Sequence, residues 1–494
     1  MNYVDALSLV FQPHTIITIL GAALFGLFVG SMPGLTATMA AALLVPITFY
    51  MDPVSAVGAI VTCSAMAIFA GDIPGALLRI PGTPASAAYV DEAYQLGRQG
   101  KLAQVLSVNL LASAMGGIFG ALVLIFLAPQ LAAVALNFSS YEYFWLALIG
   151  LSAATLVSAS NPIKGCISLF MGLFLATVGL DVVTGFPRYT MDSVNLMGGV
   201  SLIAALIGLF AVAELFRKAT TIDEDLPPPP QVKGAILTQG IAAIRQYKLN
   251  VLRGSTLGTF LGILPGAGAD IAGWISYAVS KRFSRTPEKF GKGHIEGVVD
   301  ASASNNAALG GAYVPALVFG IPGDSITAIV IGVLLIKGLN PGPTVFTESG
   351  DIVAAIFIVF ILANLLLIPL GLLAIRAAGK VLSVNQRILL PVILMLSIVG
   401  AFAVNNSVFD LWIVLVLGIL GWLMEDNGFP IAPMVLGLVL GKIVEESFVN
   451  SMIKSDGNLV HFVDRPISGT LAAVFFAIWI VPLIIRLVRR PKAA

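Results

Sequence analysis

The stretch GTFLGILPGAGAD, residues 258–270, decides how this chain folds. It is apolar on both sides of Pro265 and carries one charged residue, Asp270. A similar stretch, GLFVGSMPGLTAT, occupies residues 26–38, and its Pro33 lies 232 positions before Pro265. Apolar helices that are interrupted at corresponding places in two halves of a chain are typical of secondary transporters. The two stretches therefore predict a membrane transporter built from two repeats.

The composition of the chain is that of a membrane protein. Of its 494 residues, 58% are hydrophobic and 11% are charged, whereas soluble domains contain about 25% charged residues. Many apolar windows reach the roughly 20 residues that cross a bilayer as a helix. The net charge of +1 gives no reason to expect a nucleic-acid partner. We therefore expect an all-α polytopic protein embedded in a lipid bilayer.

The sequence pattern does not favour an enzyme. The three histidines fall in expected loops and flanks, and both cysteines lie in apolar segments. No metalloprotease, serine-hydrolase or nucleotide-binding motif occurs. We expect no catalytic residue, no transition metal and no cofactor, and an intramembrane enzyme is the weakest of the functions considered.

The distribution of apolar and polar segments divides the chain into four parts. Residues 1–216 are expected to form the N-terminal transmembrane repeat and residues 217–253 a cytoplasmic polar linker, in which the prolines at 227–230 are extended. Residues 254–447 are expected to form the C-terminal inverted repeat, and residues 448–494 an extra helix with a basic tail. Each repeat would contain five spans and one broken or re-entrant hairpin. The expected spans lie near 54–78, 102–127, 143–158, 163–180, 194–216, 299–321, 351–376, 388–403, 410–425 and 430–447, with the extra helix near 467–486.

Clusters of Lys and Arg predict the orientation. They lie in the linker, after residue 280, around residues 376–387 and at the C-terminus, and the positive-inside rule places all of them in the cytoplasm. Segment 254–280 would then enter and leave on the cytoplasmic side as a re-entrant hairpin with arms of 11–14 residues. Segment 16–50 has no Lys or Arg on its flanks, so its ends would lie outside. It is either a second re-entrant hairpin or two full spans.

A second pair of matching blocks, residues 80–87 and 321–328, adds two more Pro-Gly interruptions, 241 positions apart. Interrupted helices expose backbone N–H groups that bind anions and C=O groups that bind cations. We expect the four interruptions to converge on one carboxylate site, although each could also be a structural kink. The predicted substrate-binding residues are Gly34, Thr36, Thr38, Thr83, Ser86, Gly266, Gly268, Asn305, Asn306, Ser325 and Thr327.

Three polar residues are predicted to bind the coupling cation, Na⁺ or H⁺: Asp270, Asp324 and Asn306. Carboxylates at membrane depth are costly and tend to be functional. Each aspartate could instead cap the helix that follows it. Asn305 and Asn306 could instead form hydrogen bonds between helices.

The sequence resembles the large membrane subunit of the bacterial tripartite tricarboxylate transporter family over nearly its whole length. The blocks that carry the resemblance are GSMPGLTATMAAALLVPITF (30–49), GDIPGALLRIPGTPASAA (71–88), GILPGAGADIAGWISYAVSKR (262–282), FGKGHIEGVVDASASNNAALGGAYVPALVFGIPGDSITA (290–328) and GLNPGP (338–343). The resemblance implies a multi-pass protein of the bacterial cytoplasmic (inner) membrane. It also implies a small four-span membrane subunit and a periplasmic solute-binding protein as partners.

These observations predict secondary active uptake of a di- or tricarboxylate, coupled to a Na⁺ or H⁺ gradient and fed by the binding protein, with the C-terminus in the cytoplasm. The alternative is a channel or facilitator for small organic anions without ion coupling, because broken helices can also line a selectivity filter.

Overall fold

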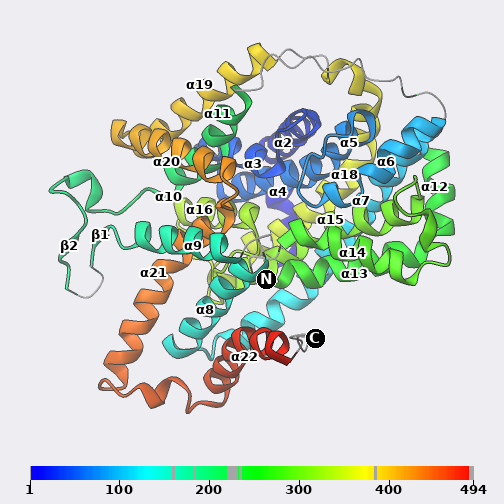
Figure 1. The fold of residues 1–494 in the computed structure, drawn as a ribbon. Helices are drawn as coiled ribbons and strands as arrows, with labels where there is room; N and C mark the ends of the chain where they lie inside the picture. The colour runs from blue at the N-terminus through cyan, green and yellow to red at the C-terminus, as the bar shows by residue number, and fades with distance from the viewer. Residues whose placement is uncertain are drawn as a thin grey trace.

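A computed structural model of the chain describes residues 2–157, 162–181, 184–219, 232, 236–265, 268–382 and 386–488. The described residues are almost entirely helical (Figure 1), and their two short strands, β1 (Gly179–Leu180) and β2 (Pro187–Arg188), pair antiparallel. Five helical stretches among these residues are long and apolar enough to span a membrane: Pro13–Ser31, Pro53–Leu78, Val90–Ala135, Gly350–Val381 and Val408–Asp426. The expectation of an all-α polytopic membrane protein is confirmed.

The helices follow one another in two comparable series. The first comprises α1 (Tyr3–Val10), α2 (Pro13–Ser31), α3 (Ala37–Thr48), α4 (Pro53–Ala70), α5 (Asp72–Leu78), α6 (Val90–Leu96), α7 (Leu102–Ala135), α8 (Ser140–Val157), α9 (Pro162–Ala176), α10 (Leu202–Leu206) and α11 (Ala213–Ala219). The second comprises α12 (Ile236–Gln246), α13 (Lys248–Ile263), α14 (Gly268–Phe283), α15 (Ile295–Phe319), α16 (Ser325–Ile336), α17 (Val345–Glu348), α18 (Gly350–Val381), α19 (Gln386–Asn405), α20 (Val408–Asp426), α21 (Ile431–Lys454) and α22 (Pro466–Val488). Short 3₁₀ turns occur at Ser86–Ala88, Val194–Leu196, Pro287–Lys289 and Leu459–Phe462, and π-helical turns at Gly97–Lys101 and Ile207–Val212.

Four interruptions separate helices at the predicted places, and we call them the first (residues 32–36), second (79–85), third (264–267) and fourth (320–324) break. The second and fourth breaks begin in the same way, because Arg79 and Gly320 both have left-handed backbone conformations that end a helix. Arg79 and Gly320 are 241 positions apart, the same offset as the matching sequence blocks.

Glycine contacts repeat in the two halves. A Cβ atom on Gly26 of α2 would lie 2.4 Å from the Cys63 carbonyl oxygen of α4, and one on Gly258 of α13 would lie 2.2 Å from the Ser304 carbonyl oxygen of α15. One helical turn further on, Gly30 meets Ala67 and Gly262 meets Ala308 in the same manner. Such small residues let two helix backbones approach closely where lipid supplies no hydrophobic driving force. Each hairpin is thereby held against the helix that follows it.

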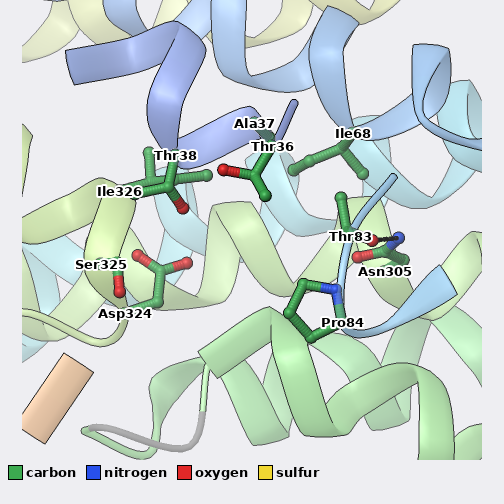
Figure 2. A pocket seen from close by; sticks show the side chains of 10 residues that line it. All are labelled: Thr36, Ala37, Thr38, Ile68, Thr83, Pro84, Asn305, Asp324, Ser325 and Ile326. Atoms are coloured by element: carbon green, nitrogen blue, oxygen red, sulfur yellow. Dashed lines mark hydrogen bonds between the residues drawn. The ribbon is translucent and has the colours of Figure 1, made fainter. Parts of the chain in front are cut away.

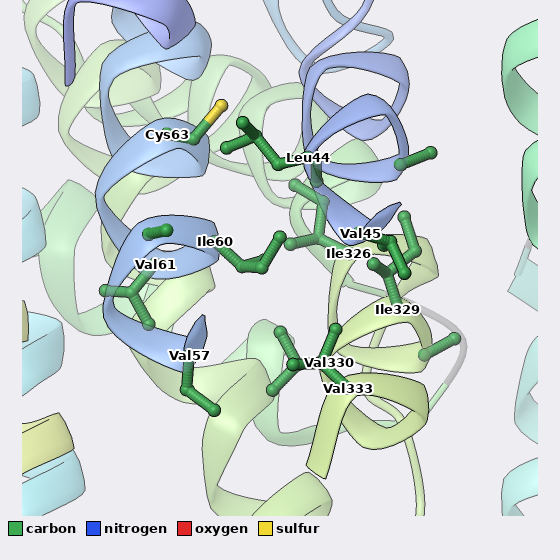
Figure 3. Close-up of a cluster of buried hydrophobic side chains, with 14 of the residues drawn as sticks. Leu44, Val45, Val57, Ile60, Val61, Cys63, Ile326, Ile329, Val330 and Val333 are labelled. Atoms are coloured by element: carbon green, nitrogen blue, oxygen red, sulfur yellow. The ribbon is translucent and has the colours of Figure 1, made fainter. Parts of the chain in front are cut away.

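The long helices exchange partners between the two series. Helix α7 packs along α15, and α18 packs along α4. The contact of α7 with α15 is again made by glycines, because Gly116 and Gly120 lie against the backbone of Ala303 and Ala307. Apolar side chains of α3, α4 and α16, including Leu44, Ile60 and Val330, fill the space between these helices (Figure 3). This packing fixes the N-terminal ends of α3 and α16 relative to each other.

The structure differs from the sequence-based expectation in the hairpin arms and in the linker. Helices α13 and α14 have 16 residues each, or about 24 Å, because they continue into their basic flanks, where Lys and Arg favour helix. The segment expected to be a polar linker contains α12, which packs on α7, and the start of α13. The proline run at 227–230 lies outside the described residues.

Candidate substrate site

A small cavity of about 30 Å³ lies where three of the four breaks meet (Figure 2). The first break and the start of α3, the second break, α15 and the fourth break with the start of α16 all contribute to its wall. The residues that line it are Thr36, Ala37, Thr38, Ile68, Thr83, Pro84, Asn305, Asp324, Ser325 and Ile326. Six of the predicted site residues, Thr36, Thr38, Thr83, Asn305, Asp324 and Ser325, therefore lie together, although they are up to 290 positions apart in the sequence.

The second and fourth breaks have the same hydrogen-bond geometry. The Asp324 carboxylate accepts a hydrogen bond from the Thr327 backbone N–H at 2.8 Å, and the Asp324 N–H donates to the Thr327 hydroxyl at 2.9 Å. Thr83 and Ser86 exchange the equivalent pair of bonds, at 3.1 and 3.0 Å. Asp324 thus caps α16, as its alternative interpretation predicted. Ser86 and Thr327 serve these turns and do not line the cavity.

The first break brings positive charge near the cavity. The Thr36 hydroxyl accepts a hydrogen bond from the Met39 N–H at 3.2 Å and so caps α3, whose first residues face the cavity. Gly34 has a left-handed backbone (φ +81°), and a Cβ atom there would lie 1.8 Å from the Lys218 ammonium nitrogen. The sequence had assigned Lys218 only to a topogenic cluster. The structure places its ammonium group against the first break.

The third break approaches the fourth. Gly268 has φ +47°, and a Cβ atom there would lie 2.6 Å from the Asp324 Cβ. Gly268 does not itself line the cavity. Gly266 lies outside the described residues, as does the Asp270 side chain, although the Asp270 backbone belongs to the first turn of α14. The roles predicted for Gly266 and Asp270 stay predictions.

The adjacent amides of α15 point in different directions. The Asn305 amide nitrogen lies 3.4 Å from the Thr83 hydroxyl, at the cavity wall (Figure 2). The Asn306 amide nitrogen donates to the Ser113 carbonyl oxygen and to the Asn364 side chain, both at 3.0 Å, so it joins α15 to α7 and α18. Its side-chain oxygen has no hydrogen-bond partner among the described residues. The structure thus places Asn306 between helices and not at the cavity.

Sequence reasoning missed a buried carboxylate beside the site. Asp72 is 3% exposed, and its Oδ1 accepts a hydrogen bond from the Tyr89 hydroxyl at 2.7 Å. The Asn305 amide nitrogen lies 3.4 Å from the same hydroxyl. The signal that could have found Asp72 is its position as an acid inside a long apolar run, residues 53–78.

The cavity combines features for an anion and a cation. Helix α3 directs its N-terminal N–H groups toward it, hydroxyl groups surround it, and the Asp324 carboxylate faces Thr36 and Thr38 across it (Figure 2). A cavity of about 30 Å³ holds roughly one or two waters, whereas sites for small organic ligands need about 300 Å³ or more. A tricarboxylate could therefore enter only after the helices around the breaks move apart.

Broken apolar helices that meet at a buried polar cavity define a polytopic membrane protein of the transporter class. The chain belongs to the TctA family of tripartite tricarboxylate transporters, whose family model matches residues 16–436. It is 34% identical over 488 residues to an uncharacterized 52.8 kDa protein in the TAR-I ttuC' 3'region of Agrobacterium vitis, covering 98% of this chain and 97% of the relative. It is also 38% identical over 214 residues to an uncharacterized protein in the TAR-II ttuC' 3'region of the same organism, covering 43% of this chain and 88% of that relative. No solved structure matches the chain.

Proposed function

We propose that this chain is the large membrane subunit of a three-component system and performs secondary active uptake of a di- or tricarboxylate, driven by a Na⁺ or H⁺ gradient. The observation that carries the proposal is the single cavity lined by residues from the first, second and fourth breaks. Membership of a family of tripartite transporters supports a small four-span membrane subunit and a periplasmic solute-binding protein as partners.

The two ends of the cavity suggest how anion and cation are bound together. The substrate carboxylate would lie at the end of the cavity formed by Thr36 and Thr38, close to the N-terminus of α3 and to Lys218. Asp324 would repel that carboxylate unless a cation lies between them. None of the residues described as lining the cavity is basic. An anion and a cation would therefore bind more favourably together than separately, which is the thermodynamic basis of symport.

The fold supports two inverted repeats of five spans as the moving framework. The matched glycine contacts Gly26–Cys63 and Gly258–Ser304, and the exchanged pairing of α7 with α15 and of α18 with α4, fit a pseudo-twofold relation. The basic clusters place the C-terminus and the α13–α14 hairpin on the cytoplasmic side of the inner membrane. Opening of the cavity would then alternate between the two sides.

Uptake by reconstituted vesicles tests this function. Vesicles containing both membrane subunits receive the binding protein and labelled citrate, with an imposed Na⁺ or proton gradient. The proposal expects accumulation above equilibrium that an ionophore for the driving ion abolishes. The alternative, a channel or facilitator, expects flux that stops at equilibrium and needs neither the gradient nor the binding protein.

A further inference from the structure

Asp72 is a buried acid with an incomplete set of partners. Only 3% of the residue is exposed, and its Oδ2 atom has no hydrogen-bond partner among the described residues, while Oδ1 accepts one bond from Tyr89. Among the described ion pairs none includes Asp72. An ionised carboxylate with one hydrogen bond and no countercharge is strongly disfavoured in a buried apolar setting. Asp72 therefore favours the neutral form, with a proton on Oδ2.

The charged groups near Asp72 are occupied elsewhere. Arg79, at the end of α5, pairs with Asp91 of α6 at 2.6 Å. Glu92 of α6 accepts hydrogen bonds from Tyr277 and from backbone N–H groups of the 291–294 loop. The parts of α2, α4 and α7 that pack against α5 contain no Asp, Glu, Lys or Arg. Tyr89 is thus the titratable side chain that contacts Asp72, and the Ser302 hydroxyl is a further polar neighbour of both.

A short hydrogen-bonded path joins Asp72 to the cavity. The Tyr89 hydroxyl bridges the Asp72 carboxyl and the Asn305 amide, and the Asn305 amide also contacts the Thr83 hydroxyl. Asn305 and Thr83 line the cavity, whereas Asp72 and Tyr89 do not. A change in the charge of Asp72 would alter which group Tyr89 donates to, and so would alter the hydrogen bonds that Asn305 can offer to a ligand.

The geometry points to Asp72 as a proton-carrying residue that couples proton uptake to carboxylate binding, separate from the cation at Asp324. The proton binds to Oδ2 when Asp72 is reached from the side of higher proton concentration and leaves from the same atom on the other side, so that one proton crosses per cycle. This inference rests on the proposed transport function.

Infrared difference spectroscopy of the purified full chain tests the proton directly, without transport. On a pH increase, wild type is expected to lose a protonated-carboxyl band that is absent from Asp72→Asn and retained in the control Asp464→Asn, whose exposed carboxylate pairs with His461. Tyr89→Phe keeps the carboxyl group but removes its hydrogen-bond donor, so the band should persist to a more alkaline pH. Absence of the band in wild type, its presence in Asp72→Asn, or its loss on adding Na⁺ at constant pH would overturn the assignment.

Vesicle transport gives the second measurement. Asp72→Asn should still exchange internal for external labelled citrate but should lose at least tenfold of the accumulation driven by a proton gradient. Full proton-driven accumulation by Asp72→Asn would overturn the inference. If wild-type vesicles accumulate nothing under any gradient, the proposed function fails, but the infrared result still decides whether Asp72 carries a proton.

Discussion

Thr83 and Asp324 occupy equivalent positions, 241 residues apart, and both open a helical turn onto the same cavity. Each accepts a hydrogen bond from a backbone N–H three residues later, but Thr83 contributes a neutral hydroxyl and Asp324 a carboxylate. The site is therefore similar in geometry and different in charge on its two sides. That difference is what would allow one side to bind an anion and the other a cation.

Asp324→Asn separates the capping role of Asp324 from its charge. Asn caps helices about as well as Asp, whereas Ala costs about 1 kcal/mol at such a position. We expect Asp324→Asn to retain the thermal stability of wild type and to lose most gradient-driven citrate accumulation, measured in vesicles. Asp324→Ala should lose both. Normal accumulation by Asp324→Asn would mean that the carboxylate serves only as a cap.

Gly258→Ala tests the close contact between α13 and α15. The added Cβ atom would lie 2.2 Å from a backbone oxygen that cannot move freely, and overpacking of this kind costs about 1–3 kcal/mol. We expect a lower melting temperature of the detergent-purified protein. Gly21→Ala is the matched control, because a Cβ atom on Gly21 has no atom within 4 Å. Equal melting temperatures for the two variants would contradict the observed packing.

Gly34→Ala tests the contact of Lys218 with the first break. Gly34 and Gly100 have nearly the same backbone conformation, φ +81° and +80°, but only Gly34 lies against another side chain. Both alanine variants carry a left-handed penalty of about 1–2 kcal/mol. Gly34→Ala should additionally displace the Lys218 ammonium group and raise the KM for citrate. A KM that rises equally in Gly100→Ala would argue against a role for this contact.

Thr38→Val tests whether hydroxyl groups of the cavity bind substrate. A net hydrogen bond contributes about 1 kcal/mol, so we expect roughly a fivefold rise in the KM for citrate with unchanged protein stability. Thr470→Val is the control, because Thr470 is exposed and its hydroxyl bonds only to the Pro466 carbonyl oxygen of its own helix. An unchanged KM in Thr38→Val would place the substrate elsewhere.

The sequence predicted most of the residues around the cavity because Pro-Gly interruptions in apolar helices have few other uses at membrane depth. It could not distinguish Asn305 from Asn306, because adjacent helical residues point about 100° apart and only the packing of α15 decides which one faces the cavity. It also missed Asp72 and the contact of Lys218. Both depend on which distant helices meet, and no local pattern in the sequence specifies that.

The most direct test of the account is the accumulation of labelled citrate by vesicles that contain both membrane subunits and receive the binding protein. We predict accumulation above equilibrium under an imposed Na⁺ or proton gradient, and its loss in Asp324→Asn. Uptake that is unaffected when every ion gradient is dissipated would contradict the account.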